Sequence, residues 1–259
     1  MKKIVALILF FNILQADAQN EKTIEQNLLT TFKKIDYWLE HYESSDKVHS
    51  SDSIAAVNEI FLAKLLKYTA ANPSTITYPF KALQKEGVNI ATSDDGLFRI
   101  YSWNTFMGGT AHDFDVVYQY KSNNKVFSKA PDYIYEEGDF GASYSAIHTV
   151  KAVNKTYYLG VSLATFSSKD CYQAINAFTI ENNSLNDSVQ IIKTKTGLKN
   201  ELGFEFNFFL LEGHNERPLQ LVYYDKVKKI LKIPVVIEAG KVTSKFIMYK
   251  FTGKYFEKI

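Results

Sequence analysis

Residues 93–120 read SDDGLFRIYSWNTFMGGTAHDFDVVYQY, and their alternation decides the fold class. Asp95-Gly96 is a strong hairpin signal between two predicted strands, residues 88–92 and 97–103. The second half of the stretch alternates apolar and polar residues again. Because successive side chains of a strand point to opposite faces, this stretch predicts the beginning of an antiparallel sheet.

The chain before residue 88 has a helical period instead. Apolar residues recur every three or four positions over residues 22–42 and again over residues 54–71, which predicts two amphipathic helices. A Ser-Asp-Ser run at 51–53 is expected to cap the second of them. A third, short helix is predicted over residues 79–86, with a proline at its first position.

Strand patterns continue to the end of the chain. Closely spaced strands without helices between them pair antiparallel. The fold class predicted is therefore α+β: an N-terminal helical segment, residues 19–87, packed on a large antiparallel β-sheet, sandwich or partial barrel, residues 88–259. Both segments are expected to form one compact unit. After 114–120 and 125–128, the further strands are predicted at 143–153, 156–166, 172–181, 188–195, 202–211, 219–225, 229–237 and 242–252.

Residues 1–18 have the pattern of a secretory signal peptide. Two lysines precede an apolar stretch from Ile4 to Leu14, and an Ala-Asp-Ala cleavage site precedes Gln19. We expect a periplasmic or secreted protein whose mature chain starts at Gln19. An uncleaved segment held in the membrane is the alternative. No later apolar run reaches the roughly 18 residues that a membrane span needs.

Charge and cysteine content narrow the classes of function. The net charge is +2, and nearly all basic residues are lysines scattered among strands, so nothing predicts nucleic-acid binding. Cys171 is the only cysteine, which excludes an intrachain disulfide. A buried core position is expected for it. The alternative is a reactive thiol, which would need His148 close by.

One strand face carries the strongest ligand-binding signal. Arg99, Tyr101 and Trp103 alternate along the predicted strand at 97–103 and therefore share a face. Aromatic faces stack on sugar rings or bases, and the Arg fork binds carboxylate or phosphate. The structural alternative is a pair of core aromatic residues with Arg99 bound to a nearby acid.

A weaker signal is the cluster of acids around His112. Asp94, Asp95, Asp113 and Asp115 accompany the imidazole, and these groups are metal ligands. The spacing matches no calcium loop. The structural alternative is that the first two acids build a turn, while the other two face water. No cofactor is predicted.

Two further motifs have structural interpretations. Residues 108–110, Gly-Gly-Thr, lack the Lys-Ser/Thr ending and the helix of a phosphate loop, which favours a turn. Glu136, Glu137 and Asp139 are adjacent acids that are typical of a solvated loop. No zinc-protease helix motif or dinucleotide fingerprint occurs in the sequence.

Several short motifs resemble a known group of proteins. SDDG at 93–96, FRIYSW at 98–103, GGT at 108–110 and YKFTGKYF at 249–256 are similar to a pattern in an uncharacterised family of secreted β-rich proteins of the Bacteroidota. The resemblance covers a small part of the chain and implies no function. The Ser-x-Asp start also resembles the Asp box of sialidases, but Gly96 comes one residue too early, so no sialidase activity is inferred.

The sequence favours a secreted or periplasmic, non-enzymatic module that binds a small molecule, a glycan or an envelope protein through Arg99, Tyr101 and Trp103. High aromatic content and the lack of a catalytic motif support this hypothesis. The alternative is a hydrolase of a polysaccharide or peptide in the cell envelope, with its site near His112, Asp113 and Asp115. A structural component of the envelope is a third possibility.

Overall fold

The computed structural model describes most of the chain after the predicted leader. The expected signal peptide, residues 1–18, lies outside the described residues, as do Glu136, Glu137 and Asp139. The described ranges are 20–41, 47–131, 140–211 and 219–259.

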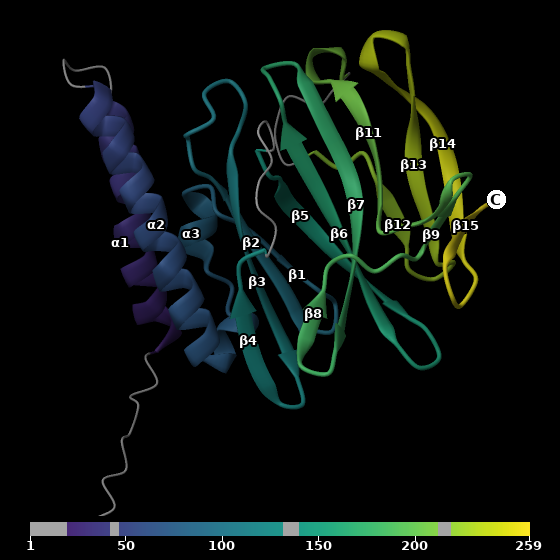
Figure 1. Ribbon diagram of the computed structural model, residues 1–259, viewed down its shortest axis with the longest axis horizontal. Coiled ribbons are helices and arrows are strands. Elements are labelled where there is room, and N and C mark those ends of the chain that lie inside the picture. The colour runs from purple at the N-terminus through teal and green to yellow at the C-terminus, as the bar shows by residue number, and fades with distance from the viewer. Residues whose placement is uncertain (1–19, 42–46, 132–139, 212–218) are drawn as a thin grey trace, which may run out of the picture.

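The N-terminal part is helical, as predicted. Helices α1 (Glu21–His41) and α2 (Lys47–Ala71) lie side by side against one face of a sheet (Figure 1). The apolar stripe of α1 is buried there, with Leu28 fully enclosed. The 51–53 run lies inside α2, so the prediction that it caps the helix is wrong. Because helices are stabilised mainly by packing of an apolar face, a Ser-Asp-Ser run does not force a helix to begin there.

A short connection follows the two long helices. A 3-10 turn spans Pro73–Ile76, and α3 spans Lys81–Lys85, two residues later than predicted. Phe80 precedes α3 in the left-handed conformation, with φ of 48°, and is fully buried. This buried aromatic residue therefore fixes the point at which the helix begins.

The first sheet, the helix-side sheet, contains the stretch that begins at Ser93. Its strands run in chain order and pair antiparallel. The turn between the first two is built by Asp95, whose Oδ1 accepts hydrogen bonds from the Ser93 hydroxyl (2.7 Å) and the Leu97 amide (3.1 Å). The strands are β1 (Asn89–Thr92), β2 (Phe98–Asn104), β3 (Phe114–Ser122) and β4 (Lys125–Lys129).

A second sheet, the central sheet, packs against the first (Figure 1). Its order is β11-β7-β6-β5, and the short β8 pairs with one end of β7. β11 therefore returns beside β7 after a detour through other strands. The strands are β5 (Ser143–Lys151), β6 (Thr156–Thr165), β7 (Asp170–Glu181), β8 (Ser184–Asn186) and β11 (Glu201–Asn207).

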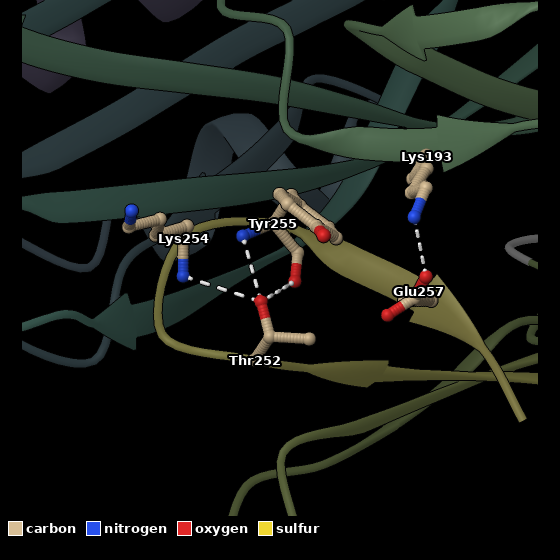
Figure 2. Close-up of polar contacts among 5 residues, drawn as sticks. All are labelled: Lys193, Thr252, Lys254, Tyr255 and Glu257. Atoms are coloured by element: carbon tan, nitrogen blue, oxygen red, sulfur yellow. Dashed lines mark hydrogen bonds and ion pairs between the residues drawn. The ribbon is translucent and has the colours of Figure 1, made fainter.

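The third sheet, the outer sheet, covers the other face of the central sheet (Figure 1). Its order is β10-β9-β15-β14-β13-β12, and the β15–β9 pair is parallel. Figure 2 shows the ion pair of Lys193 and Glu257 that joins these two strands at 2.5 Å. The strands are β9 (Ile192–Thr194), β10 (Gly197–Lys199), β12 (Tyr223–Asp225), β13 (Ile230–Ile237), β14 (Lys241–Phe251) and β15 (Phe256–Lys258).

The helices and the three sheets thus form successive layers with a buried core at each junction. The predicted α+β class with a sandwich-like β region is confirmed. The single large sheet of the prediction is divided into three sheets, and none of them closes into a barrel. Among the described helices, none is both long and apolar enough to span a bilayer.

Candidate functional site

The predicted binding face of Arg99, Tyr101 and Trp103 lies inside the protein. These side chains are 4, 0 and 0% exposed and face the helices. Helices cover one face of β2 and the central sheet covers the other, so six of its seven residues are buried. A ligand has no access to this face in the folded protein, and the predicted platform is corrected to a core position.

Arg99 has a structural role in that core. Its Nη1 donates hydrogen bonds to the backbone oxygens of Thr75 (2.8 Å) and Tyr78 (2.6 Å). Its Nε donates to the Thr92 hydroxyl at 2.7 Å. The alternative prediction placed an acid beside this guanidinium, whereas its hydrogen-bond partners are two carbonyls and a hydroxyl. Arg99 therefore fixes the connection between α2 and α3 to the sheet.

The structure does not bring the acids around His112 together as a set of three metal ligands. The Asp113 carboxylate accepts a 2.6 Å hydrogen bond from Thr105, and the backbone of His112 pairs with Thr165 of β6. Burial, and to a lesser degree the charge of Asp113, raises the pKa of Asp115 to about 6, so the alternative prediction that this acid faces water is wrong. Within the described ranges, no group of three His, Cys, Asp or Glu side chains is placed to hold a metal ion.

Asp94 and Asp95 form a structural turn, as the alternative interpretation predicts. Beyond its own turn, Asp95 accepts a 3.1 Å hydrogen bond from the Tyr158 hydroxyl in the central sheet. Asp94 accepts one from the Thr149 amide (3.3 Å) and pairs with Lys226 next to the outer sheet at 2.5 Å. This turn therefore connects all three sheets, and its carboxylates are engaged by neighbouring side chains.

The glycine pair and the cysteine are also structural. Gly108 lets the backbone pass close to the Ala111 carbonyl, and Gly109 has φ of 64°. Cys171 is 1% exposed in an apolar cluster that includes Phe206. The predicted turn and the predicted core cysteine are both confirmed.

A partly open cleft between the helix-side and central sheets is the best candidate site. We call it the inter-sheet cleft. Its volume is about 500 Å³, within the range of about 300 to 1,000 Å³ that is typical of small-molecule sites. Half of its lining residues belong to strands of the central sheet, Tyr118 comes from the opposite sheet, and the rest lie in connecting segments. The described residues that line it are Tyr118, Gly141, Ala142, Tyr144, Ser162, Ala164, Phe166, Tyr172, Asn176, Phe178, Asp187, Ser188, Asn200 and Glu201.

A chain of hydrogen bonds crosses the floor of the cleft and ends at Glu201. The Ser162 hydroxyl donates to Asn176 Oδ1 at 2.7 Å. Asn176 Nδ2 then donates to Glu201 Oε2 at 2.6 Å, and the Tyr172 hydroxyl donates to Oε1 at 2.7 Å. Since each member is held by the next, this chain fixes the direction of the Glu201 carboxylate.

The fold brings these residues together through strand pairing. Ser162, Asn176 and Glu201 belong to β6, β7 and β11, which are neighbours in the central sheet. Asn176 pairs directly with Glu201, and both face the helix-side sheet. Gly203 has no side chain on this face, and a Cβ there would overlap the Tyr172 ring. Because Gly203 has no side chain, the Tyr172 ring can cross β11 and reach Glu201.

Aromatic rings border the cleft, and three of them are buried. Tyr118 and Phe178 have ring centroids 5.6 Å apart, and Tyr144 lies 6.2 Å from Phe178. These rings continue into the buried core between the two sheets. Phe166 is 44% exposed. The cleft therefore combines the partly exposed rings of Phe166 and Tyr172 with oriented polar groups, the usual composition of a small-molecule site.

The electrostatics of the cleft are acidic. Asp187 and Glu201 are the charged residues of its described lining, which contains no Lys, Arg or His. Glu201 has neutral hydrogen-bond donors as partners, and no ion pair found in the described residues includes it. Burial, followed by the hydrogen bond to Glu201, raises the pKa of the Tyr172 phenol. The phenol therefore stays a neutral donor at physiological pH.

The sequence contains a weak signal for this site that we did not use. Tyr172 and Asn176 are four residues apart on one strand, and Glu201 and Gly203 are two apart on another, so each pair shares a face. Polar residues on alternate positions of two apolar strands are unusual for a face covered by another sheet. These two faces meet because β7 pairs with β11, and local sequence patterns do not specify that pairing.

No family model, curated protein sequence or solved structure matches the chain. The inference of function therefore depends on the geometry of the inter-sheet cleft. Membership of the secreted β-rich family of the Bacteroidota stays a prediction.

Proposed function

We propose that the protein is an exported, non-enzymatic module that binds a saccharide in the inter-sheet cleft. The observation that carries the proposal is the hydrogen-bond chain from Ser162 to Glu201, which lies in the same cavity as the partly exposed rings of Phe166 and Tyr172. A sugar presents hydroxyl donors on its edge and an apolar face for stacking. Oriented carboxylate and amide groups beside aromatic rings match both features.

The proposal keeps the binding module of the sequence hypothesis but places it elsewhere. The site moves from the buried face around Arg99 to the cleft beside β7 and β11. The signal pattern of residues 1–18 supports export to the periplasm or the exterior. Expression of the full chain in a Gram-negative host, followed by fractionation and N-terminal sequencing, tests this part. A mature chain starting at Gln19 in the envelope fraction is expected, whereas cytosolic chain starting at Met1 would contradict it.

Binding itself is tested by a glycan array followed by calorimetry on the purified chain. Tyr172→Phe removes the hydroxyl that orients Glu201 but keeps the ring, and we expect affinity to fall about ten-fold, or about 1.4 kcal/mol. Lys250→Ala, at an exposed position of the outer sheet, is the matched control and should bind like the wild type. If the wild type binds no glycan, or if Tyr172→Phe binds normally, the proposed site is wrong.

A hydrolase is the second candidate, and one observation favours it. Asp187 and Glu201 place two carboxylates on one cleft, as glycoside hydrolysis requires. Reducing ends released from any glycan that binds would reveal this activity. If Asp187→Asn and Glu201→Gln each abolish the release, the protein is an enzyme. If the glycan is recovered intact, the binding module stands.

A further inference from the structure

We infer that the saccharide bound in the inter-sheet cleft carries a free amine, as an amino sugar does. The inference rests on the proposed function and adds the charge of the ligand to it. The charge of the cleft supplies the first argument. Its described lining holds two acids and no basic side chain. Glu205, on the same face of β11, adds a further carboxylate close to Tyr172.

The acceptor positions and the charge of the Glu201 carboxylate also support an amine. A carboxylate offers about four acceptor positions, and the hydrogen bonds from Tyr172 and Asn176 occupy two of them. Both donors are neutral, so neither compensates the negative charge. A ligand ammonium at the remaining positions would form a charge-assisted hydrogen bond, roughly twice as strong as a neutral one.

Accessible aromatic rings are a third feature that favours a cation. The rings of Phe166 and Tyr172 line the same cavity as Glu201 and are partly exposed. The negative face of an aromatic ring attracts a cation, and this attraction is larger where water is partly excluded. The same arrangement disfavours phosphates and sugar acids, whose charge is repelled by both carboxylates. Stacking on an aromatic ring favours a sugar, and the two carboxylates favour a sugar that carries a positive charge.

The test compares three sugars by calorimetry: glucosamine, glucose, which has nearly the same size, and N-acetylglucosamine, in which an acetyl group removes the charge of the amine. Glucosamine is expected to bind at least about ten-fold more tightly than the two neutral sugars, a difference of about 1.4 kcal/mol. Because charge-assisted contacts weaken in salt, the preference should shrink at high ionic strength.

The decisive variant is Glu201→Gln, which keeps the shape of the side chain and removes its charge. The preference should disappear, so that the variant binds glucosamine and glucose with affinities within about three-fold of each other. Glu59→Gln is the matched control, an exposed acid of α2 outside the described lining, and should keep the preference. Equal binding of glucose and glucosamine by the wild type would overturn the inference and leave the proposed function standing. Failure of all three sugars, together with an empty glycan array, would overturn the proposed function itself.

Discussion

The ring of Tyr172 lies across Gly203 of the neighbouring strand, in the space where any other residue would place its Cβ. The two residues come from β7 and β11, so the pairing of these strands creates the space that the ring occupies. The orientation of Glu201 therefore depends on a residue without a side chain.

Gly203→Ala should displace the Tyr172 ring, break its hydrogen bond to Glu201 and weaken saccharide binding about ten-fold. Overlap of the new methyl group with the ring and with Ala174 should lower the free energy of unfolding by about 1 to 3 kcal/mol. Urea denaturation of Gly203→Ala, of Tyr172→Ala and of the double variant measures the energetic coupling between the two positions. A smaller effect of Gly203→Ala in the Tyr172→Ala background is expected. Strictly additive effects would show that the ring does not occupy this space.

Arg99 should contribute to stability and not to binding. Arg99→Met leaves the carbonyls of Thr75 and Tyr78 without their donor, which should cost about 2 to 4 kcal/mol in the free energy of unfolding. Lys33→Ala, which breaks the more exposed 3.0 Å ion pair with Glu86, should change it by less than about 1 kcal/mol. A folded Arg99→Met variant that has lost glycan binding would restore the binding role predicted from the sequence.

The buried carboxyl of Asp115 should make stability depend on pH. Its pKa is raised from 3.8 to about 6, so between these values the folded state binds more protons than the unfolded state. The free energy of unfolding therefore falls as pH rises through this window, and the cost is complete above pH 6.

Asp115→Asn removes that cost. It should stabilise the protein at neutral pH by about 1 to 2 kcal/mol, after allowance for partial solvent exposure, and have little effect near pH 4. Thermal unfolding followed across pH measures the difference. Asp52→Asn, at an exposed position of α2, should leave the profile unchanged. A stability difference for Asp115→Asn that is the same at every pH would exclude titration as its cause.

A fully buried glutamine should control the segment before β12. Gln173 Nε2 donates to the Leu219 oxygen at 2.9 Å, and its Oε1 accepts hydrogen bonds from the amides of Leu221 and Val222, each at 3.1 Å. Gln173→Leu should lower the free energy of unfolding by about 2 to 4 kcal/mol and accelerate amide exchange at both positions.

Gln119→Leu provides the matched control for this effect. Gln119 is equally buried in the helix-side sheet and donates to the Thr69 oxygen at 2.9 Å. Its replacement should cost similar stability, while amide exchange at Leu221 and Val222 stays as in the wild type below the unfolding transition. Slow exchange at these amides in Gln173→Leu would show that other contacts hold the segment.

Local sequence patterns predicted the helices and strands well, because the period of a helix or strand is a property of neighbouring residues. The change from a helical to a strand period near residue 88 matches the end of α3 and the start of β1 at Asn89. The hairpin at Asp95-Gly96 follows from side-chain chemistry within the turn. Short strands such as β8 and β10 were not predicted, since three residues are too few for alternation to be recognised.

The site was not predicted, because its residues meet only through long-range pairing. Alternation along β2 separates two faces but does not tell which is exposed, and both are covered in this protein. Arg99 therefore resembled a surface residue in the sequence. The inter-sheet cleft requires β11 beside β7, a pairing that bypasses the two strands between β8 and β11 in the chain.

The place of β15 within the outer sheet has a consequence for the order of folding. β9 and β10 are synthesised well before β15, yet β15 is the strand that joins them to β14. Lys193 and Glu257, which pair across this junction, are 64 residues apart in the chain. The β9–β10 hairpin lacks this neighbour until β15 has been synthesised, so we expect closure of the outer sheet to be a late and slow step of folding. A chain cut just before Phe256 would lose the link between the two halves of the sheet.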